Sequence, residues 1–354
     1  MQLEKRIKTF VALGKFMGQF STEEYSEKEN IPYNDVYFNE MVSLIKLSKS
    51  YNGWFSEDNI QFAFNSWAKA LTEDNLIQWT SNYNLENSSN KTVALVLAGN
   101  IPLVGFHDFL SVLISGNKVL AKLSSNDKLL LPFLTKYLIS VEPEFENKIT
   151  FTEEKLEEFD AVIATGSNNT ARYFDYYFGK YPNIIRKNRN SVAILTGNES
   201  HEQLEKLSDD IFRYFGLGCR NVSKLYLPKD YNFDIFFKAM FKWNKVINDH
   251  KYINNYDYNK AVYLMSNLNL LDNEFLLLKE DPNFSSPISV LFHETYENKE
   301  VLEQLIITEK DNIQCVVSEI GMENEIGFGE TQNPQLWDYA DDIDTLDFLL
   351  KLPE

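Results

Sequence analysis

The two cysteines of the chain, Cys219 and Cys315, are its candidates for covalent chemistry. Cys219 stands in the segment FGLGCRN, with Gly216 and Gly218 before it and Arg220 after it. Glycines let the backbone come close to a ligand, and a neighbouring cation favours the nucleophilic thiolate. Cys315 stands in the run DNIQCVVSE, which is typical of a buried strand, where a free cysteine packs as a small hydrophobic residue. The sequence therefore predicts Cys219 as the nucleophile.

Two further segments combine a strand exit with polar residues. KTVALVLAGN (91–100) is an apolar run that ends at Asn100, whose side-chain amide can donate to an oxyanion, although Asn is also a common turn residue. ATGSNNTAR (164–172) ends a strand at Gly166 and Ser167 and opens a helix. The N–H groups at a helix start suit a phosphate, while a Ser that only caps the helix is the structural alternative. Taken singly, neither segment decides between its two interpretations.

The histidines do not extend this set. None of the four shows a metal-binding spacing or a pattern that pairs it with a cysteine; they are His107, His201, His250 and His293. His107 follows Asn100 on a predicted helix and is expected to be a packed or surface residue. No metal site is predicted.

Strands and helices alternate in the part of the chain that must position these residues. Residues 1–90 have apolar residues at three- and four-residue spacing and are predicted to be helical. The principal predicted strands that follow are 91–100, 117–125, 160–167, 191–197 and 222–228. Pro102 is expected in the first turn of the next helix, and Ser200 is expected to cap the helix that leads to Cys219. This alternation predicts an α/β fold with a mostly parallel sheet.

Composition narrows the class of protein. A chain of 354 residues predicts two domains, and its formal net charge of −18 argues against a nucleic-acid binder, because phosphate contacts need clustered Lys and Arg. The N-terminal stretch is broken by charges and lacks a signal-peptide cleavage site, and no apolar run reaches the length of a membrane span. Two cysteines make no disulfide framework, so a cytoplasmic location is expected.

In order and spacing, these segments resemble the aldehyde dehydrogenase superfamily, and most closely the bacterial acyl-CoA reductases of the LuxC-like type. AGNIPLVGFHDFLSVLISGNKVLAKLSS (98–125) is similar to the family's Asn-x-Pro loop, helix and strand. GLGCRNVSKLYLP (216–228) is similar to the Gly-x-x-Cys nucleophile turn and the strand after it. FGETQNPQLWDYAD (328–341) is similar to the Phe-Gly segment that closes the catalytic domain. The resemblance covers residues 91–350.

The resemblance implies a role for each candidate residue. Cys219 is the acyl-accepting nucleophile, and Asn100 holds the oxyanion. Lys122 contacts the adenosine ribose of the cofactor, and Gly166 and Ser167 lie at its pyrophosphate. The implied fold has two domains, each with a mostly parallel sheet, behind a helical N-terminal leader. The expected divisions are a helical segment (1–90), an NADP-binding Rossmann-like domain (91–197), a catalytic domain (198–330) and a C-terminal segment that docks back (331–354).

Departures from the family pattern favour reduction. Oxidising members carry a Glu, the base for the deacylating water, about where this chain has Arg186 and Lys187. Reduction of a thioester needs no such base, and the two cations are predicted to attract CoA phosphates. NAD-preferring members often place a carboxylate three positions after the ribose lysine, where this chain has Ser125, which favours NADPH. The family's second Glu, which lies on a catalytic-domain strand and faces the nicotinamide ribose, is not evident here. NFSSPISVLFHE (283–294) is the equivalent predicted strand, and Asn283 in it stands nearest the place of that Glu.

The predicted function is therefore NADPH-dependent reduction of a fatty acyl-CoA to the aldehyde through a thioacyl-cysteine. An acyl-transferring partner protein fits this role. The polar stretch NLENSSN (84–90) leaves little room for the family's oligomerisation hairpin, so the oligomeric state stays open. One alternative is an NAD(P)-dependent aldehyde dehydrogenase that forms acid. The other is a catalytically silent relative that only binds a ligand.

Overall fold

The N-terminal part of the chain is helical, as the apolar periodicity predicts. The computed structural model describes residues 1–22, 24–86 and 90–353, so part of the NLENSSN stretch lies outside the described residues. The helices before the first strand are α1 (Leu3–Met17), α2 (Asn34–Tyr51), α3 (Glu57–Ala70) and α4 (Glu73–Thr80), with the 3₁₀ turn η1 (Gly18–Phe20) after α1. None of the described helices is long and apolar enough to cross a membrane.

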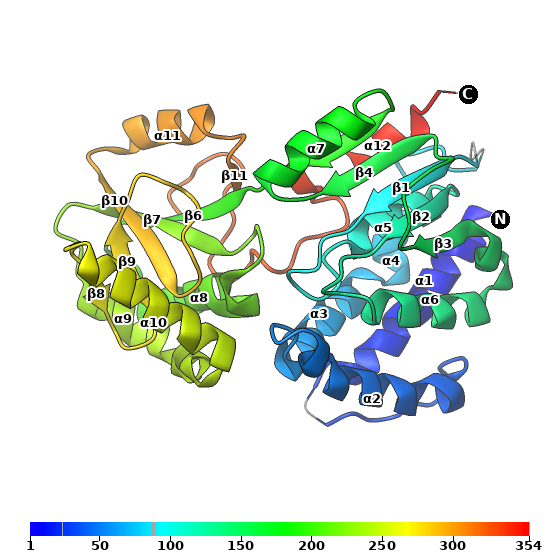
Figure 1. The fold of residues 1–354 in the computed structure, drawn as a ribbon, viewed down its shortest axis with the longest axis horizontal. Coiled ribbons are helices and arrows are strands. Elements are labelled where there is room, and N and C mark those ends of the chain that lie inside the picture. The colour runs from blue at the N-terminus through cyan, green and yellow to red at the C-terminus, as the bar shows by residue number, and fades with distance from the viewer. Residues whose placement is uncertain (23, 87–89, 354) are drawn as a thin grey trace. The chain divides into compact units, whose positions relative to one another are not determined.

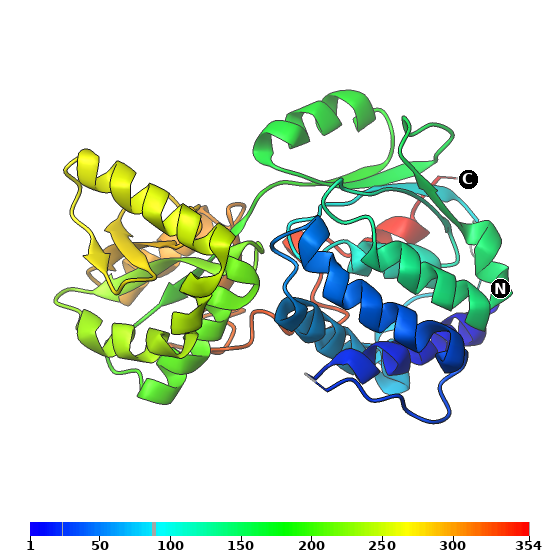
Figure 2. The same ribbon diagram turned by 60° about the horizontal axis from the view of Figure 1, so that its bottom comes forward.

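A five-stranded parallel sheet follows these helices. Its strands are β1 (Thr92–Val96), β2 (Lys118–Lys122), β3 (Ile149–Thr152), β4 (Ala161–Thr165) and β5 (Asn183–Arg186), in the order β3-β2-β1-β4-β5. The crossovers are α5 (Phe106–Ile114), α6 (Leu130–Val141) with η2 (Pro143–Lys148), and α7 (Asn168–Phe178). Helices α5 and α6 share one face with the N-terminal helices, and α7 covers the other (Figure 2). The strand order reverses between β1 and β4, which is where open α/β sheets bind ligands.

One local expectation in this sheet was wrong. Pro102 does not lie in the first turn of a helix, because α5 begins only at Phe106, with Gly105 as its N-cap. Residues 98–105 instead form a loop at the exit of β1, in which Leu103 has a φ of 57°. The extra loop length carries Asn100 away from the strand before the helix begins.

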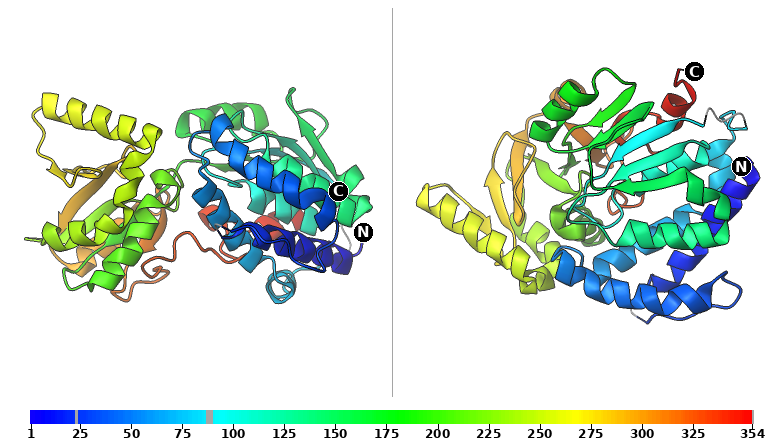
Figure 3. Two further views of the ribbon diagram at one scale, coloured as in Figure 1. Left: turned by 90° about the horizontal axis from the view of Figure 1, so that it is seen from below. Right: turned by 45° about the vertical axis from the view of Figure 1, so that its right-hand side comes forward.

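The last part of the chain returns to this first unit. Residues 335–354 belong with residues 1–187 and contain η5 (Ala340–Asp342) and α12 (Thr345–Leu350), so both chain ends lie in one unit (Figure 3). The Nε1 of Trp79 donates to the hydroxyl of Tyr339 at 2.7 Å, and the hydroxyl of Tyr83 donates to Asp344 at 2.7 Å. These contacts tie the C-terminal segment to the helical leader.

Residues 188–334 form a second unit around a six-stranded sheet (Figure 1). Its strands are β6 (Asn190–Ile194), β7 (Val222–Pro228), β8 (Leu271–Asp272), β9 (Leu277–Glu280), β10 (Val290–Tyr296) and β11 (Ile313–Val317), in the order β11-β6-β7-β10-β9-β8. Only the β8–β9 pairing is antiparallel within the described sheet. The helices are α8 (His201–Phe212), α9 (Phe233–Met240), α10 (His250–Met265) and α11 (Lys299–Thr308), with 3₁₀ turns η3 (Arg213–Gly216) and η4 (Phe241–Asn248). Ser200 caps α8 in a capping box, as predicted.

The division between the units differs from the expected boundary near Gly197. Strand β6 pairs with β7 and β11, so the run SVAIL belongs to the second sheet, and the units divide after Lys187. The second unit then runs to Pro334 rather than to residue 330. An apolar β-branched strand fits either sheet equally well, and only its pairing partners decide which one it joins.

Candidate active site

Cys219 lies on an exposed turn between η3 and β7 in the second unit. The turn is held from inside by Asn221, which is 2% exposed. Its Nδ2 donates to the carbonyls of Asp210 (3.0 Å) and Arg213 (2.8 Å) at the end of α8, and its Oδ1 accepts from the N–H of Gly218 at 2.8 Å. The hydroxyl of the buried Ser191 donates to the carbonyl of Cys219 at 3.0 Å. The thiol is thus accessible on a backbone fixed from both sides.

The approach to this turn is strained. Tyr214, Phe215 and Gly216 have successive φ values of 55°, 59° and 73°, in the left-handed region. Each of the two aromatic residues costs about 1–3 kcal/mol in such a conformation, which persists only where the surroundings impose it. Strain of this kind is concentrated at functional sites, so its place directly before Cys219 supports a functional turn.

A buried carboxylate binds the Phe-Gly segment beside the same helix end. Asp210 is fully buried, and it accepts from the N–H of Gly329 (2.7 Å), the N–H of Thr331 (3.1 Å) and the hydroxyl of Thr331 (2.7 Å). Burial raises the pKa of Asp210 to about 6, and these donors oppose the rise. A Cβ on Gly329, whose φ is 86°, would lie 3.1 Å from the Cβ of Lys206. The segment therefore approaches α8 closely at Gly329, where the positive φ also favours glycine.

Sequence reasoning missed four residues of this arrangement: Ser191, Asp210, Asn221 and Thr331. Asn221 offered a signal, because Asn side chains in turns often bind nearby backbone groups. The other three are ordinary strand, helix and loop residues by type. Cys315, in contrast, is 4% exposed on β11, as predicted.

In the first unit, the exits of β2 and β4 carry the predicted cofactor residues. Lys122 ends β2, and its Nζ donates to the carbonyl of Glu154 at 2.9 Å, while Ser125 is exposed beyond it. Gly166 and Ser167 follow β4, and the Ser167 hydroxyl accepts from the N–H of Thr170 at 3.3 Å as the N-cap of α7. Ser167 therefore caps the helix, which the sequence left open as the alternative to phosphate binding. A capped helix start still directs its first N–H groups outward, so capping leaves a phosphate role open.

The loop that carries Asn100 is anchored underneath. The Nδ2 of Asn52 donates to the carbonyl of Gly99 at 3.3 Å and to that of Asn126 at 3.2 Å, which ties the exits of β1 and β2 together. A Cβ on Gly99 would lie 2.7 Å from the side chain of Ser124, so only glycine fits this approach. Asn100 lies in the first unit and Cys219 in the second, so their joint hold on an oxyanion stays a prediction.

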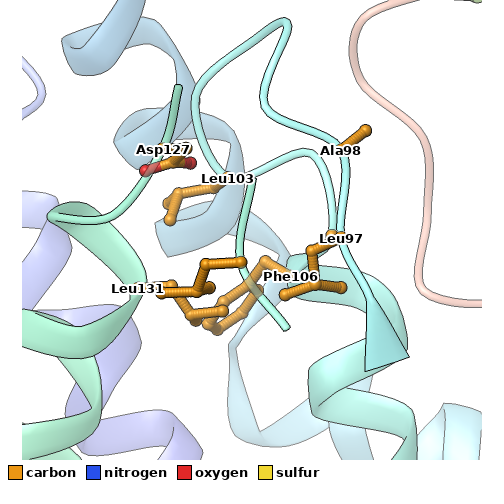
Figure 4. Close-up of a pocket in the computed structure, with 8 residues that line it drawn as sticks. Leu97, Ala98, Leu103, Phe106, Asp127 and Leu131 are labelled. Atoms are coloured by element: carbon orange, nitrogen blue, oxygen red, sulfur yellow. The ribbon is translucent and has the colours of Figure 1, made fainter. Parts of the chain in front are cut away.

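A small cavity lies below this loop (Figure 4). Its volume is about 10 Å³, room for about one water molecule. Apolar side chains and Asp127 line it, and Asp127 is 8% exposed. Burial raises the pKa of Asp127 to about 6, and the backbone N–H groups of Leu103, Leu130 and Leu129 oppose the rise. This site supports the loop and is too small for a substrate.

Arg186 does not have the role predicted for it. Its side chain is buried, and Nη2 donates to Asp108 at 2.6 Å and to the hydroxyl of Thr345 at 3.2 Å, while Nη1 donates to the carbonyl of Ala340 at 3.1 Å. A guanidinium held by these partners cannot bind a CoA phosphate, so Arg186 holds the C-terminal segment instead. Lys187, the next residue, is exposed, and its phosphate role stays a prediction.

Removal of this buried cation is expected to destabilise the first unit. Arg186→Met leaves the carboxylate of Asp108 buried and uncompensated, so the free energy of unfolding should fall by about 3–5 kcal/mol. The double variant Arg186→Met/Asp108→Leu should recover most of that loss. Urea unfolding measures both, with Lys187→Met as the exposed control, expected within about 0.5 kcal/mol of wild type. A single variant as stable as that control would show that the pair does not hold the segment.

Two further candidates have structural surroundings. His107 contacts the carbonyl of Leu336 through Nε2 at 2.8 Å and lies among aromatic rings, so it is packed. Asn283 precedes β10, which begins only at Val290, and its Nδ2 donates to Asp281 at 2.8 Å. A role for Asn283 at the cofactor ribose stays a prediction.

A family model described as acyl-CoA reductase (LuxC) matches residues 6–236. The chain belongs to this family. The matched range contains every candidate from Asn100 to Cys219, and the family together with the fold identifies a LuxC-type oxidoreductase that acts on aldehyde or acyl groups. No curated protein matches the sequence of this LuxC-family chain.

Solved structures confirm the predicted fold. The indole-3-acetaldehyde dehydrogenase AldA of P. syringae, in complex with NAD+ and IAA, has a TM-score of 0.65 and 14% identity, over 92% of this chain and 74% of that one. Aldehyde dehydrogenase 21 from Physcomitrella patens, in complex with succinate, has a TM-score of 0.63 and 12% identity, over 90% of this chain and 74% of that one. At such identities the likeness shows that the LuxC-family chain has the aldehyde dehydrogenase fold, and no more.

Proposed function

We propose that this chain reduces an acyl-CoA thioester to the aldehyde, using NADPH and a thioacyl intermediate on Cys219. The observation that carries the proposal is the exposed thiol of Cys219 on a strained turn held by Asn221 and Ser191, in a chain of the LuxC acyl-CoA reductase family. An exposed thiol also argues against a silent ligand-binding relative, for which an occluded cysteine would be expected.

The strand exits of the first unit fit a nicotinamide dinucleotide. They lie at the reversal of strand order, where this class of sheet binds such cofactors. Gly166, Ser167 and the start of α7 would hold the pyrophosphate, and Lys122 would hold the adenosine ribose. Lys122 provides a positive charge at the β2 exit, where its Nζ binds the neutral carbonyl of Glu154, and Ser125 adds no carboxylate. When bound, the cofactor supplies the hydride.

The residues of the chain then have defined tasks. The thiolate of Cys219 attacks the thioester carbon, a new carbon–sulfur bond forms, and CoA leaves with the electrons of its own carbon–sulfur bond and takes up a proton. The side-chain amide of Asn100 and the backbone N–H of Cys219 donate to the oxyanion. With a hydride supplied by the bound cofactor, the thioacyl carbonyl would become a thiohemiacetal anion, held by the same donors. Its collapse would break the carbon–sulfur bond, release the aldehyde and return Cys219 as the thiolate. Lys187 is the exposed cation proposed to attract CoA phosphates.

The lifetime of the acyl-enzyme tests this function. No Glu occupies the position of the deacylating base, and neither Arg186 nor Lys187 can activate water at neutral pH. An acyl adduct on Cys219 should therefore persist after mixing with acyl-CoA alone, and NADPH should convert it to aldehyde. Mass spectrometry follows the adduct, and a panel of acyl-CoA chain lengths with aldehyde trapping follows the product. Hydrolysis of the adduct to fatty acid within seconds would instead support the aldehyde dehydrogenase alternative.

Cofactor preference makes a separate prediction. Ser125→Glu places a carboxylate beside the proposed 2′-phosphate, so NADPH affinity should fall by about tenfold, which is about 1.4 kcal/mol of repulsion, while NADH affinity changes little. Ser43→Glu, an equally exposed change on α2, is the matched control and should alter neither affinity. Titration of both cofactors measures the difference. Equal affinities that do not respond to Ser125→Glu would mean that Ser125 does not face the 2′-phosphate.

A further inference from the structure

Contacts on two sides link the nucleophile turn, residues 218–221, to the Phe-Gly segment, residues 328–331. On one side, Asn221 binds the carbonyl of Asp210, whose carboxylate holds Thr331. On the other side, Arg220, next to Cys219, donates from Nη1 to the carbonyl of Thr331 at 3.4 Å. The contacts therefore close a ring that leaves the turn at Asn221 and returns to it at Arg220.

This ring joins parts of the chain that sequence separates widely. Asp210 and Thr331 are 121 residues apart, and Arg220 and Thr331 are 111 apart. Asp210, Asn221 and Thr331 are all at most 2% exposed, so water does not compete for these contacts. The left-handed residues Tyr214 and Phe215 lie between Arg213 and Gly218, and the side chain of Asn221 binds the backbone of both. A strained path clamped at both ends allows the thiol little movement.

We propose that Asp210 and Thr331 are positioning residues for the nucleophile, and that the Phe-Gly segment sets the place and reactivity of the Cys219 thiol. The inference rests on the proposed role of Cys219. The contacts of Asp210 and Thr331 with the turn run through Asn221 and Arg220, respectively. The segment is then part of the active-site apparatus of the second unit, in addition to closing that unit's fold.

The ring also makes the turn sensitive to acid. The carboxylate form of Asp210 accepts from all three donors, and the pKa of Asp210, raised to about 6 by burial, sets where that form is lost. The adjacent carboxylate of Asp209 raises the pKa of Asp210 further, and Asp209 is itself paired with Lys242 of η4 at 2.6 Å. The charged residues that lie against the Phe-Gly segment are Lys206, next to Gly329, and Arg220, which binds the carbonyl of Thr331. The hydroxyl of Thr331 lowers the pKa of Asp210, so removal of this hydroxyl should raise that pKa further.

Thr331→Val and Thr331→Ser distinguish a positioning role for the Thr331 hydroxyl from a role in stability alone. The valine keeps the volume and loses the hydroxyl, so kcat and the rate of Cys219 alkylation by iodoacetamide should fall by about tenfold to a hundredfold, with the KM for acyl-CoA nearly unchanged. The pH below which kcat falls should also be higher in the valine variant than in wild type. The serine keeps the hydroxyl, so it should restore kcat, the alkylation rate and the pH dependence of kcat. Thr9→Val, another buried threonine hydroxyl, on α1 of the first unit, is the control and should change none of them.

Thermal unfolding of each variant shows the temperature range in which it is folded, and alkylation is followed by mass spectrometry within that range. Asp210→Asn removes the acceptor carboxylate instead of the hydroxyl, and it should slow alkylation to a similar extent. Rates for Thr331→Val that equal those for Thr9→Val would overturn the inference, as would a loss of thermal stability with unchanged alkylation. A wild-type chain that forms no acyl adduct on Cys219 would contradict the proposed function instead, and the alkylation comparison would still test the ring.

Discussion

Replacement of Cys219 by alanine is expected to abolish acyl-CoA reduction, with a loss of at least about 10³-fold, and to remove all acyl labelling. The reason is that no other group in the turn can form the thioacyl bond, and the covalent step precedes hydride transfer in the proposed reaction. Turnover with acyl-CoA and NADPH measures the first effect, and mass spectrometry of the protein after acyl-CoA addition measures the second. The exposed position of Cys219 means that the fold should tolerate this change.

Cys315→Ala is the matched control for that experiment. Cys315 is buried on β11, where its sulfur accepts from Arg220 at 3.5 Å. The change removes a small packed group and this contact, while Cys219 itself stays in place. A modest loss of stability, of about 1 kcal/mol, is expected, with acyl labelling retained. Retained turnover in Cys219→Ala, or labelling lost only in Cys315→Ala, would refute the central claim.

Asn100→Ala is expected to lower kcat by about 10²–10³-fold, because in the proposed reaction it removes one donor to the oxyanion that develops during acyl transfer. The KM for acyl-CoA should change little, since the interaction strengthens only in the transition state, and kcat/KM should fall as much as kcat. The side chain lies in the loop after β1, where Asn52 holds the neighbouring Gly99. Steady-state kinetics over a range of acyl-CoA concentrations measures both parameters.

Asn39→Ala, an exposed change on α2, is the control for this prediction and should leave both parameters unchanged. Thermal unfolding should show that Asn100→Ala keeps its fold. A fall in kcat of less than about threefold would mean that the oxyanion is held by other groups, and the family role carried over to Asn100 would then fail.

Several features of this protein followed from local sequence. The apolar run before Asn100 and the run after Cys219 became β1 and β7, and Ser200 capped α8. Cys315 proved buried within a strand. The order of such elements, with the motifs between them, was enough to predict the aldehyde dehydrogenase fold and the LuxC family. Periodicity, capping and turn chemistry act between residues a few positions apart, so a single sequence displays them directly.

Other features depended on partners far away in the chain. The sequence predicted Arg186 to be an accessible cation. The fold places it against Asp108, 78 residues earlier, and against the C-terminal segment. Strand β6 read as part of the first domain until its pairing with β7 and β11 placed it in the second. Asp210 and Thr331 carried no local mark of a shared contact. Long-range packing decides whether a charge is buried, which sheet a strand joins and which donor meets which acceptor. Residue type and spacing leave these three features undecided, so only the tertiary structure could determine them.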